Sequence, residues 1–405
     1  GDNNVAVGYA ALYQEDGHGK NVAVGKNALY TLNAGADGLN VAVGFEAGVL
    51  INTGVKNTLI GGLAGDAMTT GFNNTVIGYD AMGANTASGA HVAIGYESLK
   101  VFNSTVNASH FNTAVGVQSG LSLATGIQNT MLGGLAGAYA TTTDGSTFVG
   151  YKAAQGIDGT KLTGNLNTVV GFQAGLIMQG SCTENTILGA YAADNLTVGN
   201  ANTFLGTYTA TDGVITGDNN TAVGHVAGAS LTSGSNNLLL GHDAGKSASP
   251  GGGIGSTNNT ITLGDNNIAT ANVKVDWTIP SDQRDKTDFT ALDIGLDFVK
   301  ALNPVTYKWD QRSDYGDQDA DDWSLLDQTP DGTHKKDWLD LGFKAQEVEA
   351  LEIAAGYNKA NKTNLTVSLN SDGEQYGMKY SKFIPILVKA IQEQNALIEA
   401  LTARV

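Results

Sequence analysis

The stretch Asn57-Thr58-Leu59-Ile60-Gly61 is one copy of a five-residue motif that decides the fold of this chain. The motif reads Asn, then Thr or Val, then an apolar residue, then Val, Ile or Leu, then Gly, and most copies keep all five positions. Its closing glycines are Gly8, Gly25, Gly44, Gly61, Gly78, Gly95, Gly116, Gly133, Gly150, Gly171, Gly189, Gly206, Gly224, Gly241 and Gly264. Successive glycines are 17 to 23 residues apart, so every departure from 17 is an insertion. This pattern predicts a solenoid of stacked coils whose loops accept extra residues.

The motif is apolar on both faces of the strand that it predicts. Side chains alternate between the faces of a strand, yet the second, third and fourth positions are nearly all aliphatic, small or Thr. Such a strand is normally buried on both faces, as in parallel sheets. We therefore expect one face to fill the coil's own core and the other to lie against another copy of the chain. Fifteen coils at ~4.8 Å each would make a rod of roughly 70 Å.

Two further columns predict how each coil turns. The Asn before each strand suits the turn that enters it, and stacked Asn side chains can share hydrogen bonds along the axis. Three residues after each closing glycine from Gly8 to Gly241 the chain has only Ala, Ser or Thr, which indicates a tight corner. Over roughly residues 3–265 the repeats resemble the head repeats of trimeric bacterial adhesins and the β-rolls of phage tail fibres. That resemblance implies a parallel β-solenoid or β-roll in a homotrimer.

The composition changes sharply near residue 280. Residues 1–280 contain 8 Lys, no Arg and 17 acidic residues, a net charge of 8 − 17 = −9, whereas residues 281–405 contain 14 basic and 22 acidic residues, a net of −8. Of the 54 glycines, 47 lie in the first part. We therefore expect a solenoid over 1–265, a linker over 266–280 and a small α+β domain over 281–405.

This composition also limits the partners. Phosphate binding needs clusters of Lys and Arg, so the acidic balance argues against nucleic acid. No run of 18 apolar residues is present, so we expect no membrane insertion. The chain begins at Gly1 inside a repeat, without Met, and we expect its natural amino terminus to lie upstream. His91, His110, His225 and His242 are too widely spaced for a familiar metal pattern, and we interpret them as surface residues.

The second part contains a succession of motifs. Ser281-Asp282-Gln283-Arg284-Asp285-Lys286 comes first, residues 292–302 then have helical spacing that Asn303-Pro304 ends, and residues 305–309 alternate like a strand. Residues 342–348 open a second helix. This order resembles the carboxy-terminal intramolecular chaperone domain of phage endosialidases and tailspikes, a domain that trimerises, helps a β-rich fibre to fold and then cuts itself off.

The resemblance assigns roles within the first motif. It implies that Ser281 is the nucleophile, that Lys286 is its general base, and that the peptide bond Pro280–Ser281 is cut, with Asp282 and Arg284 in supporting positions. Asp285 departs from the family, which often has an apolar residue there. The chemistry is also plausible by itself: a serine hydroxyl needs a base, and a lysine serves when desolvation or a neighbouring cation, here Arg284, lowers its pKa.

The last segment has the spacing of a coiled coil over residues 384–405. Its seam consists of Ile384, Leu387, Ile391, Gln394, Ile398, Leu401 and Val405. An amphipathic helix packed on its own domain is the alternative. The Asp-rich segment from Asp314 to Asp322 could bind Ca²⁺, but we interpret it as a solvated loop. We expect no cofactor and no bound metal ion.

Together these features favour a structural and adhesive protein over an enzyme with turnover. We expect the distal part of a phage tail fibre, in the extracellular virion tail and made in the host cytoplasm. It would form a homotrimer, bind a glycan or protein receptor on the host surface and contact other virion tail proteins. One alternative is a glycan-degrading tailspike, which would need paired carboxylates such as Asp66, Asp80, Glu97 or Asp243. The other is a bacterial trimeric surface adhesin.

Overall fold

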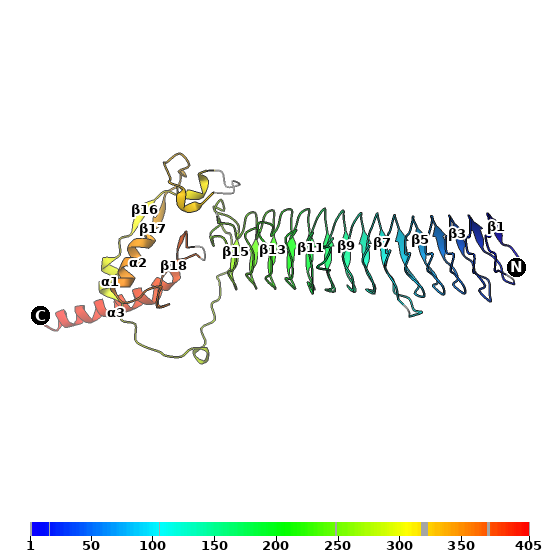
Figure 1. The fold of residues 1–405 in the computed structure, drawn as a ribbon. Helices are drawn as coiled ribbons and strands as arrows, with labels where there is room; N and C mark the ends of the chain where they lie inside the picture. Colours follow the sequence, from blue (N-terminus) through cyan, green and yellow to red (C-terminus); the bar gives the residue numbers. More distant parts are fainter. Residues whose placement is uncertain are drawn as a thin grey trace. The chain divides into compact units, whose positions relative to one another are not determined.

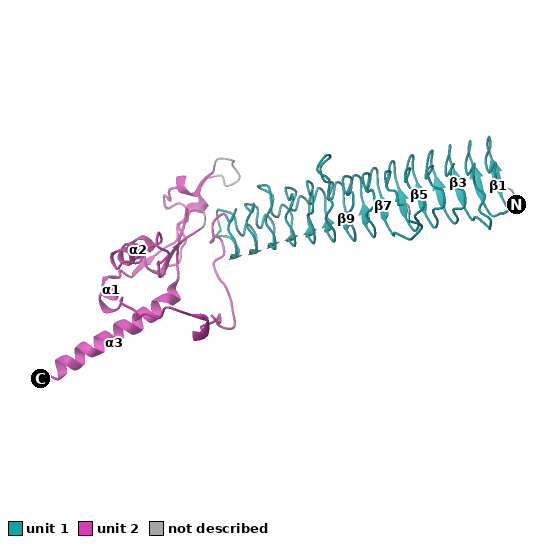
Figure 2. Cartoon of the chain, turned by 60° about the horizontal axis from the view of Figure 1, so that its bottom comes forward, with its two compact units in different colours: residues 1–249, 254–265 teal, residues 250–253, 266–405 magenta. Residues whose placement is uncertain are grey.

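The computed structural model describes residues 2–15, 17–104, 106–247, 249–316, 323–370 and 373–404. Its contacts divide the chain into two compact units, which Figure 2 colours separately. Unit 1 comprises Gly1–Ser249 and Ile254–Asp265, and unit 2 comprises Pro250–Gly253 and Asn266–Val405. The repeats therefore lie in unit 1, and the motifs that follow the linker lie in unit 2.

Unit 1 is one sheet of fifteen parallel strands stacked in chain order (Figure 1). Each strand pairs in register with the next, so that Thr58 lies opposite Thr75 and Ile60 opposite Ile77. The predicted parallel β-solenoid is confirmed. The strands are β1 (Val5–Val7), β2 (Val22–Val24), β3 (Val41–Val43), β4 (Thr58–Ile60), β5 (Thr75–Ile77), β6 (Val92–Ile94), β7 (Thr113–Val115), β8 (Thr130–Leu132), β9 (Thr147–Val149), β10 (Thr168–Val170), β11 (Thr186–Leu188), β12 (Thr203–Leu205), β13 (Thr221–Val223), β14 (Leu238–Leu240) and β15 (Ile261–Leu263).

The middle residue of each strand points into the coil. From β2 to β15 this residue is buried, and the residues on either side of it are half-buried or exposed. Leu59 and Phe148, for example, are fully buried, and they share one core with side chains from the returning part of the coil, such as Ile51 and Met68. One strand face therefore fills the core, and the other points out of the chain.

A column of asparagines enters the strands inside the solenoid. The backbone N–H of Asn57 donates to Asn40 Oδ1 at 2.9 Å, and Asn57 Nδ2 donates to the carbonyl oxygen of Gly71 in the next coil at 2.8 Å. Asn74 repeats the first bond on Asn57 at 3.0 Å. These side chains are almost fully buried, so the amides satisfy backbone groups that water does not reach. The predicted hydrogen-bonded Asn ladder is present.

The closing glycines are required by both backbone conformation and crowding. From Gly8 to Gly241 their φ angles lie between 110° and 147°, where residues with a side chain are strained. A Cβ on Gly78 would also lie 2.3 Å from the carbonyl oxygen of Gly95 in the next coil. The small corner residues that follow, such as Ala64 and Ala81, are fully buried. Glycine and a small corner residue together let each coil turn tightly against its neighbour.

Unit 2 is a small α+β unit. Strand β16 (Val305–Tyr307) pairs antiparallel with β17 (Asp340–Gly342), and β18 (Val367–Leu369) pairs antiparallel with β19 (Tyr376–Met378). The α-helices are α1 (Leu296–Ala301), α2 (Ala345–Ala354) and α3 (Phe383–Thr402), and the 3₁₀ turns are η1 (Gln283–Asp285), η2 (Arg312–Asp314), η3 (Leu325–Asp327) and η4 (Tyr380–Lys382). Among the described residues, no helix has both the length and the apolar character needed to cross a bilayer.

The first helix of unit 2 is shorter than the sequence pattern predicts. Helical spacing begins at Leu292, but α1 begins at Leu296, where the backbone N–H donates to Glu393 Oε2 of α3 at 2.7 Å. A carboxylate at a helix amino terminus accepts hydrogen bonds from N–H groups that have no partner within the helix. Ile294 lies before this start and packs in the core of unit 2 with Phe298 of α1 and Phe383 of α3. The apolar residues before Leu296 are thus spaced for burial rather than for a helix, and the helix begins where Glu393 accepts its first backbone N–H.

Candidate functional site

The Ser281–Lys286 pair lies around the short turn η1. Asp282 caps this turn, because its Oδ1 accepts a hydrogen bond from the backbone N–H of Arg284 at 2.9 Å. The turn shortens the segment and brings Lys286 back toward Ser281. Lys286 Nζ lies 2.5 Å from Ser281 Oγ and 3.4 Å from the carbonyl oxygen of Ser281. The structure thus places the residues predicted as nucleophile and base within hydrogen-bonding distance.

The structure places Arg284 against Asp282 rather than against Lys286. Arg284 Nη2 lies 2.6 Å from Asp282 Oδ2, and Nε lies 3.1 Å and 3.2 Å from the two carboxylate oxygens. The hydrogen bonds between these side chains lower the pKa of Asp282 and raise that of Arg284. The ion pair between Asp282 and Arg284 therefore stabilises the η1 turn, which brings Ser281 and Lys286 together.

The Ser281–Lys286 pair is exposed in the isolated chain, as is Pro280. A lysine works as a general base when burial disfavours its charged form. Ser281 Oγ needs no docking step to reach the carbonyl carbon of Pro280, because the two residues are covalently joined. The arrangement therefore has a nucleophile, a proton acceptor and a nearby carbonyl. A second surface that covered Lys286 would disfavour its charged form and make it a better base.

The outward face of the solenoid carries an apolar strip that we call the aliphatic column. It consists of the residue before each closing glycine: Val7, Val24, Val43, Ile60, Ile77, Ile94, Val115, Leu132, Val149, Val170, Leu188, Leu205, Val223, Leu240 and Leu263. Ile60 is 38 % exposed, Leu188 45 % and Leu205 40 %. Eight of the fifteen residues are exposed and the other seven are half-buried, so the column leaves an apolar strip that is partly open to solvent. Apolar strips of this kind often mark interaction surfaces.

Helix α3 buries one face in unit 2 and exposes another. Phe383, Ile386 and Ala390 are buried. The residues predicted to form a coiled-coil seam lie on the exposed face, where Ile384 is 62 % exposed and Ile391 58 % exposed. Leu387, Gln394, Ile398 and Leu401 are exposed as well, and Val405 lies outside the described residues. One face of the helix thus packs on its own unit, as in the alternative, and the coiled coil stays a prediction for the exposed face.

Three of the acidic residues considered for a glycan-degrading site, Asp66, Asp80 and Glu97, lie near one another in successive coils. Lys100 Nζ lies 2.9 Å from Asp80 Oδ2 and 2.6 Å from Glu97 Oε1, and these hydrogen bonds raise the pKa of Lys100. Burial and the nearby Asp80 raise the pKa of Asp66. Lys100 thus bridges two of the acids. Residues 317–322, the greater part of the Asp-rich segment considered for Ca²⁺, lie outside the described residues.

The expectation of surface histidines is wrong for His91, which is only 1 % exposed. Its backbone N–H donates to Asn74 Oδ1 at 3.0 Å, and its Nε2 lies 3.1 Å from Ser88 Oγ. Burial, with a smaller effect of His110, lowers the pKa of His91 to about 3, so the ring is neutral at physiological pH. The signal was in the sequence, because His91 occupies the Asn position of its coil.

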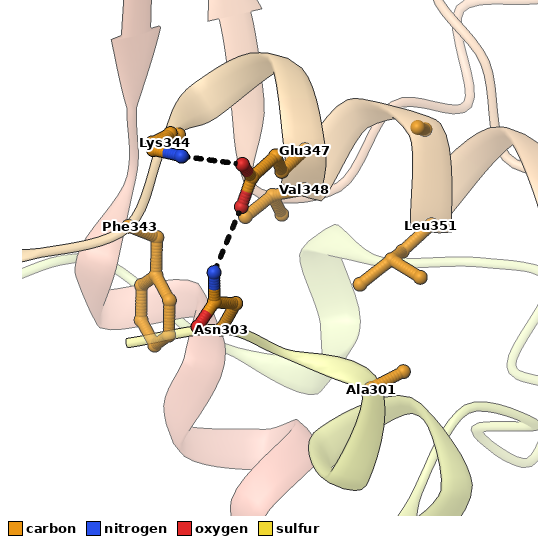
Figure 3. A pocket seen from close by; sticks show the side chains of 8 residues that line it. Ala301, Asn303, Phe343, Lys344, Glu347, Val348 and Leu351 are labelled. Carbon is orange, nitrogen blue, oxygen red and sulfur yellow. Dashed lines mark hydrogen bonds and ion pairs between the residues drawn. The ribbon is translucent and has the colours of Figure 1, made fainter. Parts of the chain in front are cut away.

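A small pocket of unit 2 lies between the end of α1 and the start of α2 (Figure 3). Its polar groups pair with one another: Lys344 Nζ lies 2.7 Å from Glu347 Oε1, and Asn303 Nδ2 donates to Glu347 Oε2 at 3.3 Å. The hydrogen bond from Lys344 lowers the pKa of Glu347. The apolar part of the lining consists of Ala301, Phe343, Val348, Ala350 and Leu351. The pocket therefore offers mainly an apolar surface.

Comparison with known proteins bears on unit 2. No curated protein and no solved structure matches the chain. The matching family model begins at Ser281, takes in the Ser281–Lys286 pair and helices α1 and α2, and ends before α3. Residues 281–357 of this chain are thus similar to the Peptidase S74 family, the chaperone of endosialidase, and they follow a parallel β-solenoid.

Proposed function

We propose that this chain is the distal part of a phage tail fibre, a homotrimer that binds the host surface and is folded by its carboxy-terminal chaperone. The observation that carries the proposal is the exposed aliphatic column, on a solenoid that precedes a segment similar to the chaperone of endosialidase. A rod of stacked coils presents the same surface many times, and its insertion loops can vary without disturbing the scaffold. Both properties suit adhesion to a cell surface.

The aliphatic column supports self-association in register. Burying apolar surface contributes about 25 cal/mol per Å² to the free energy of association. A column that runs the length of the array would therefore strongly stabilise a complex in which it is buried. An identical chain carries the same column at the same spacing, and every coil can then contact its equivalent coil. We infer three chains, as in the repeat proteins that this sequence resembles.

A chaperone solves a kinetic problem of this architecture. Parallel strands joined by loops lose entropy before they gain contacts, and a slip by one coil would still pair similar residues. Three chains must therefore start in register. A trimerising unit 2, with the exposed seam of α3 joined between chains, would align the three solenoids at one end before their coils stack.

The Ser281–Lys286 pair would then release the chaperone. Ser281 Oγ attacks the carbonyl carbon of Pro280 while Lys286 Nζ accepts the hydroxyl proton, and the Pro280–Ser281 amide bond breaks as an ester to Ser281 Oγ forms. The freed Ser281 amine takes up a proton, and water hydrolyses the ester to leave a carboxylate on Pro280. Trimer assembly would supply the cover that favours a neutral Lys286, and this couples cleavage to correct assembly.

Light scattering on two chains tests the proposal. Residues 1–405 carrying Ser281→Ala should give a soluble trimer, and residues 1–280 should give insoluble or monomeric material when expressed alone. Soluble trimers of 1–280 would refute the chaperone role, and a compact monomer of the longer chain would refute the trimer. Adhesion is tested separately, by binding of the labelled trimer to bacterial cells. Release of reducing ends from their polysaccharide would instead favour the tailspike alternative.

A further inference from the structure

One cluster at the end of the repeat array has no part in the function proposed above. His242 follows the closing glycine of β14, and Asp265 follows the closing glycine of β15, so the two residues occupy the same column in adjacent coils. Asp243 comes directly after His242. The three side chains belong to unit 1, and they converge although 23 residues separate His242 from Asp265.

The distances between the ligand atoms fit a shared cation. His242 Nδ1 lies 3.3 Å from Asp243 Oδ2 and 3.3 Å from Asp265 Oδ2, and one ligand atom from each residue lies within 4.8 Å of the others. Zinc binds imidazole nitrogen and carboxylate oxygen at about 2.0–2.2 Å, which places two ligands of a tetrahedral ion about 3.4 Å apart. The separations around His242 Nδ1 are therefore close to those of ligands on one ion.

The surroundings hold these groups in place. The ring of His242 stacks on that of His225 with centroids 5.5 Å apart and planes 10° apart, which restrains the plane of the His242 ring. The backbone N–H of Asp243 donates to the carbonyl oxygen of His225 at 3.2 Å. The side chains of Asp243 and Asp265 are only 16 % and 11 % exposed, whereas His242 is 58 % exposed and open to solvent. Lys246 Nζ lies 3.7 Å from Asp243 Oδ1 and balances part of this charge, whereas Asp243 Oδ2 and Asp265 Oδ2 both face His242 Nδ1. Two carboxylate oxygens beside an imidazole nitrogen favour a cation, and the open side allows one to enter.

We propose that His242, Asp243 and Asp265 bind a divalent first-row transition-metal ion such as Zn²⁺. An imidazole ligand favours these ions over Ca²⁺ and Mg²⁺, which prefer oxygen ligands throughout. Three protein ligands leave the remaining position to water or to another molecule. Because the ligands come from the last two coils, the ion joins β15 to the solenoid at the end where no further coil stacks. Binding to the folded chain alone stabilises it.

Calorimetric titration with ZnCl₂ on the chain of residues 1–405 tests this proposal, with metal content measured after dialysis. We expect one Zn²⁺ per chain. His242→Gln and Asp265→Asn should each weaken binding by at least about 100-fold, since even the partners of metal ligands contribute 10- to 100-fold. His18→Gln is the matched control, because it changes a histidine between β1 and β2, at the other end of the strand order from β14, and should leave the stoichiometry unchanged and the affinity within about threefold.

Two outcomes would overturn the site. Either the unmutated chain takes up no Zn²⁺, in which case the contacts are ion pairs between His242 and the acids, or all variants bind Zn²⁺ equally. If a variant does not fold, titration of the unmutated chain with Co²⁺ still decides the matter, because bound cobalt gives visible absorption bands that depend on its ligands. Absence of those bands at saturating Co²⁺ would contradict the proposal.

Discussion

His91 shows how one residue can depart from a column and keep the fold. It takes the position that asparagine holds in the coils on either side, and its backbone N–H still donates to the asparagine below it, Asn74. The ring packs against Phe102 and His110, with centroids 4.6 Å and 6.0 Å away. The exchange replaces a neutral amide by a group that can titrate, which makes this coil sensitive to acid.

We predict that His91→Asn makes the protein less sensitive to acid. The unfolded chain protonates this histidine near its ordinary pKa of 6.5, whereas the folded chain does so only at about 3. Between these values the unfolded state binds more protons, so His91 makes stability fall as pH falls, by up to about 1.4 kcal/mol per pH unit. Thermal unfolding at pH 7 and pH 4.5 should show a smaller loss in the variant. The exposed His225→Asn should keep the loss of the unmutated chain, and an equal loss in both variants would contradict the burial effect.

A second prediction at this scale concerns cleavage. Ser281→Ala removes the nucleophile and should leave one full-length band on a denaturing gel where the unmutated chain gives two. Lys286→Met removes the proton acceptor, keeps similar length and should slow cleavage by at least about 100-fold. Lys274→Met, a change to a lysine of the exposed segment before the site, serves as control. Cleavage of Ser281→Ala at the normal rate would exclude Ser281 as the nucleophile.

Among the elements, each strand has only three residues and depends on its neighbours. The glycine that closes it packs on the glycine of the next coil, and outside this contact rings stack from coil to coil. The series Tyr151, Phe172, Tyr191, Tyr208, His225 and His242 has centroid separations of 5.1 to 6.3 Å. Where these rings lie nearly parallel they cover one another's faces, so they stabilise coil stacking and present their edges outward.

The glycine column gives a prediction at the scale of elements. Gly78→Ala places a Cβ 2.3 Å from the carbonyl oxygen of Gly95 and imposes a φ of 141° on alanine. We expect a loss of more than about 2 kcal/mol, seen as a lower midpoint in chemical unfolding. Gly17→Ala is the control, because its Cβ would have nothing within 4 Å. Equal midpoints for the two variants would show that β4 to β6 tolerate a wider spacing.

For the whole molecule, the aliphatic column allows the proposed trimer to be tested separately from the folding of the single chain. Leu205 is 40 % exposed, so Leu205→Lys should leave the coil folded in one chain but place a charge within the proposed interface. We predict that the trimer dissociates to monomers or forms at least about tenfold more weakly, measured by light scattering over a dilution series. Val214→Lys is the matched control, because Val214 is 56 % exposed and lies outside the column. Trimers of normal stability in Leu205→Lys would exclude this column as the contact surface.

The solenoid could be predicted from the sequence because its contacts repeat between neighbouring coils, whereas the Ser281–Lys286 pair was singled out by the resemblance to the chaperone domain. A 17-residue period with glycine at its end repeats one set of neighbour contacts, and a five-residue separation closes within one turn. Other features depend on contacts between coils. Strands that are apolar on both faces do not reveal which face lies inside, and only the structure assigned Leu59 to the core and Ile60 to the outside. Tertiary structure also buried His91 and brought His242 to Asp265, because stacking places residues from separate coils side by side in space.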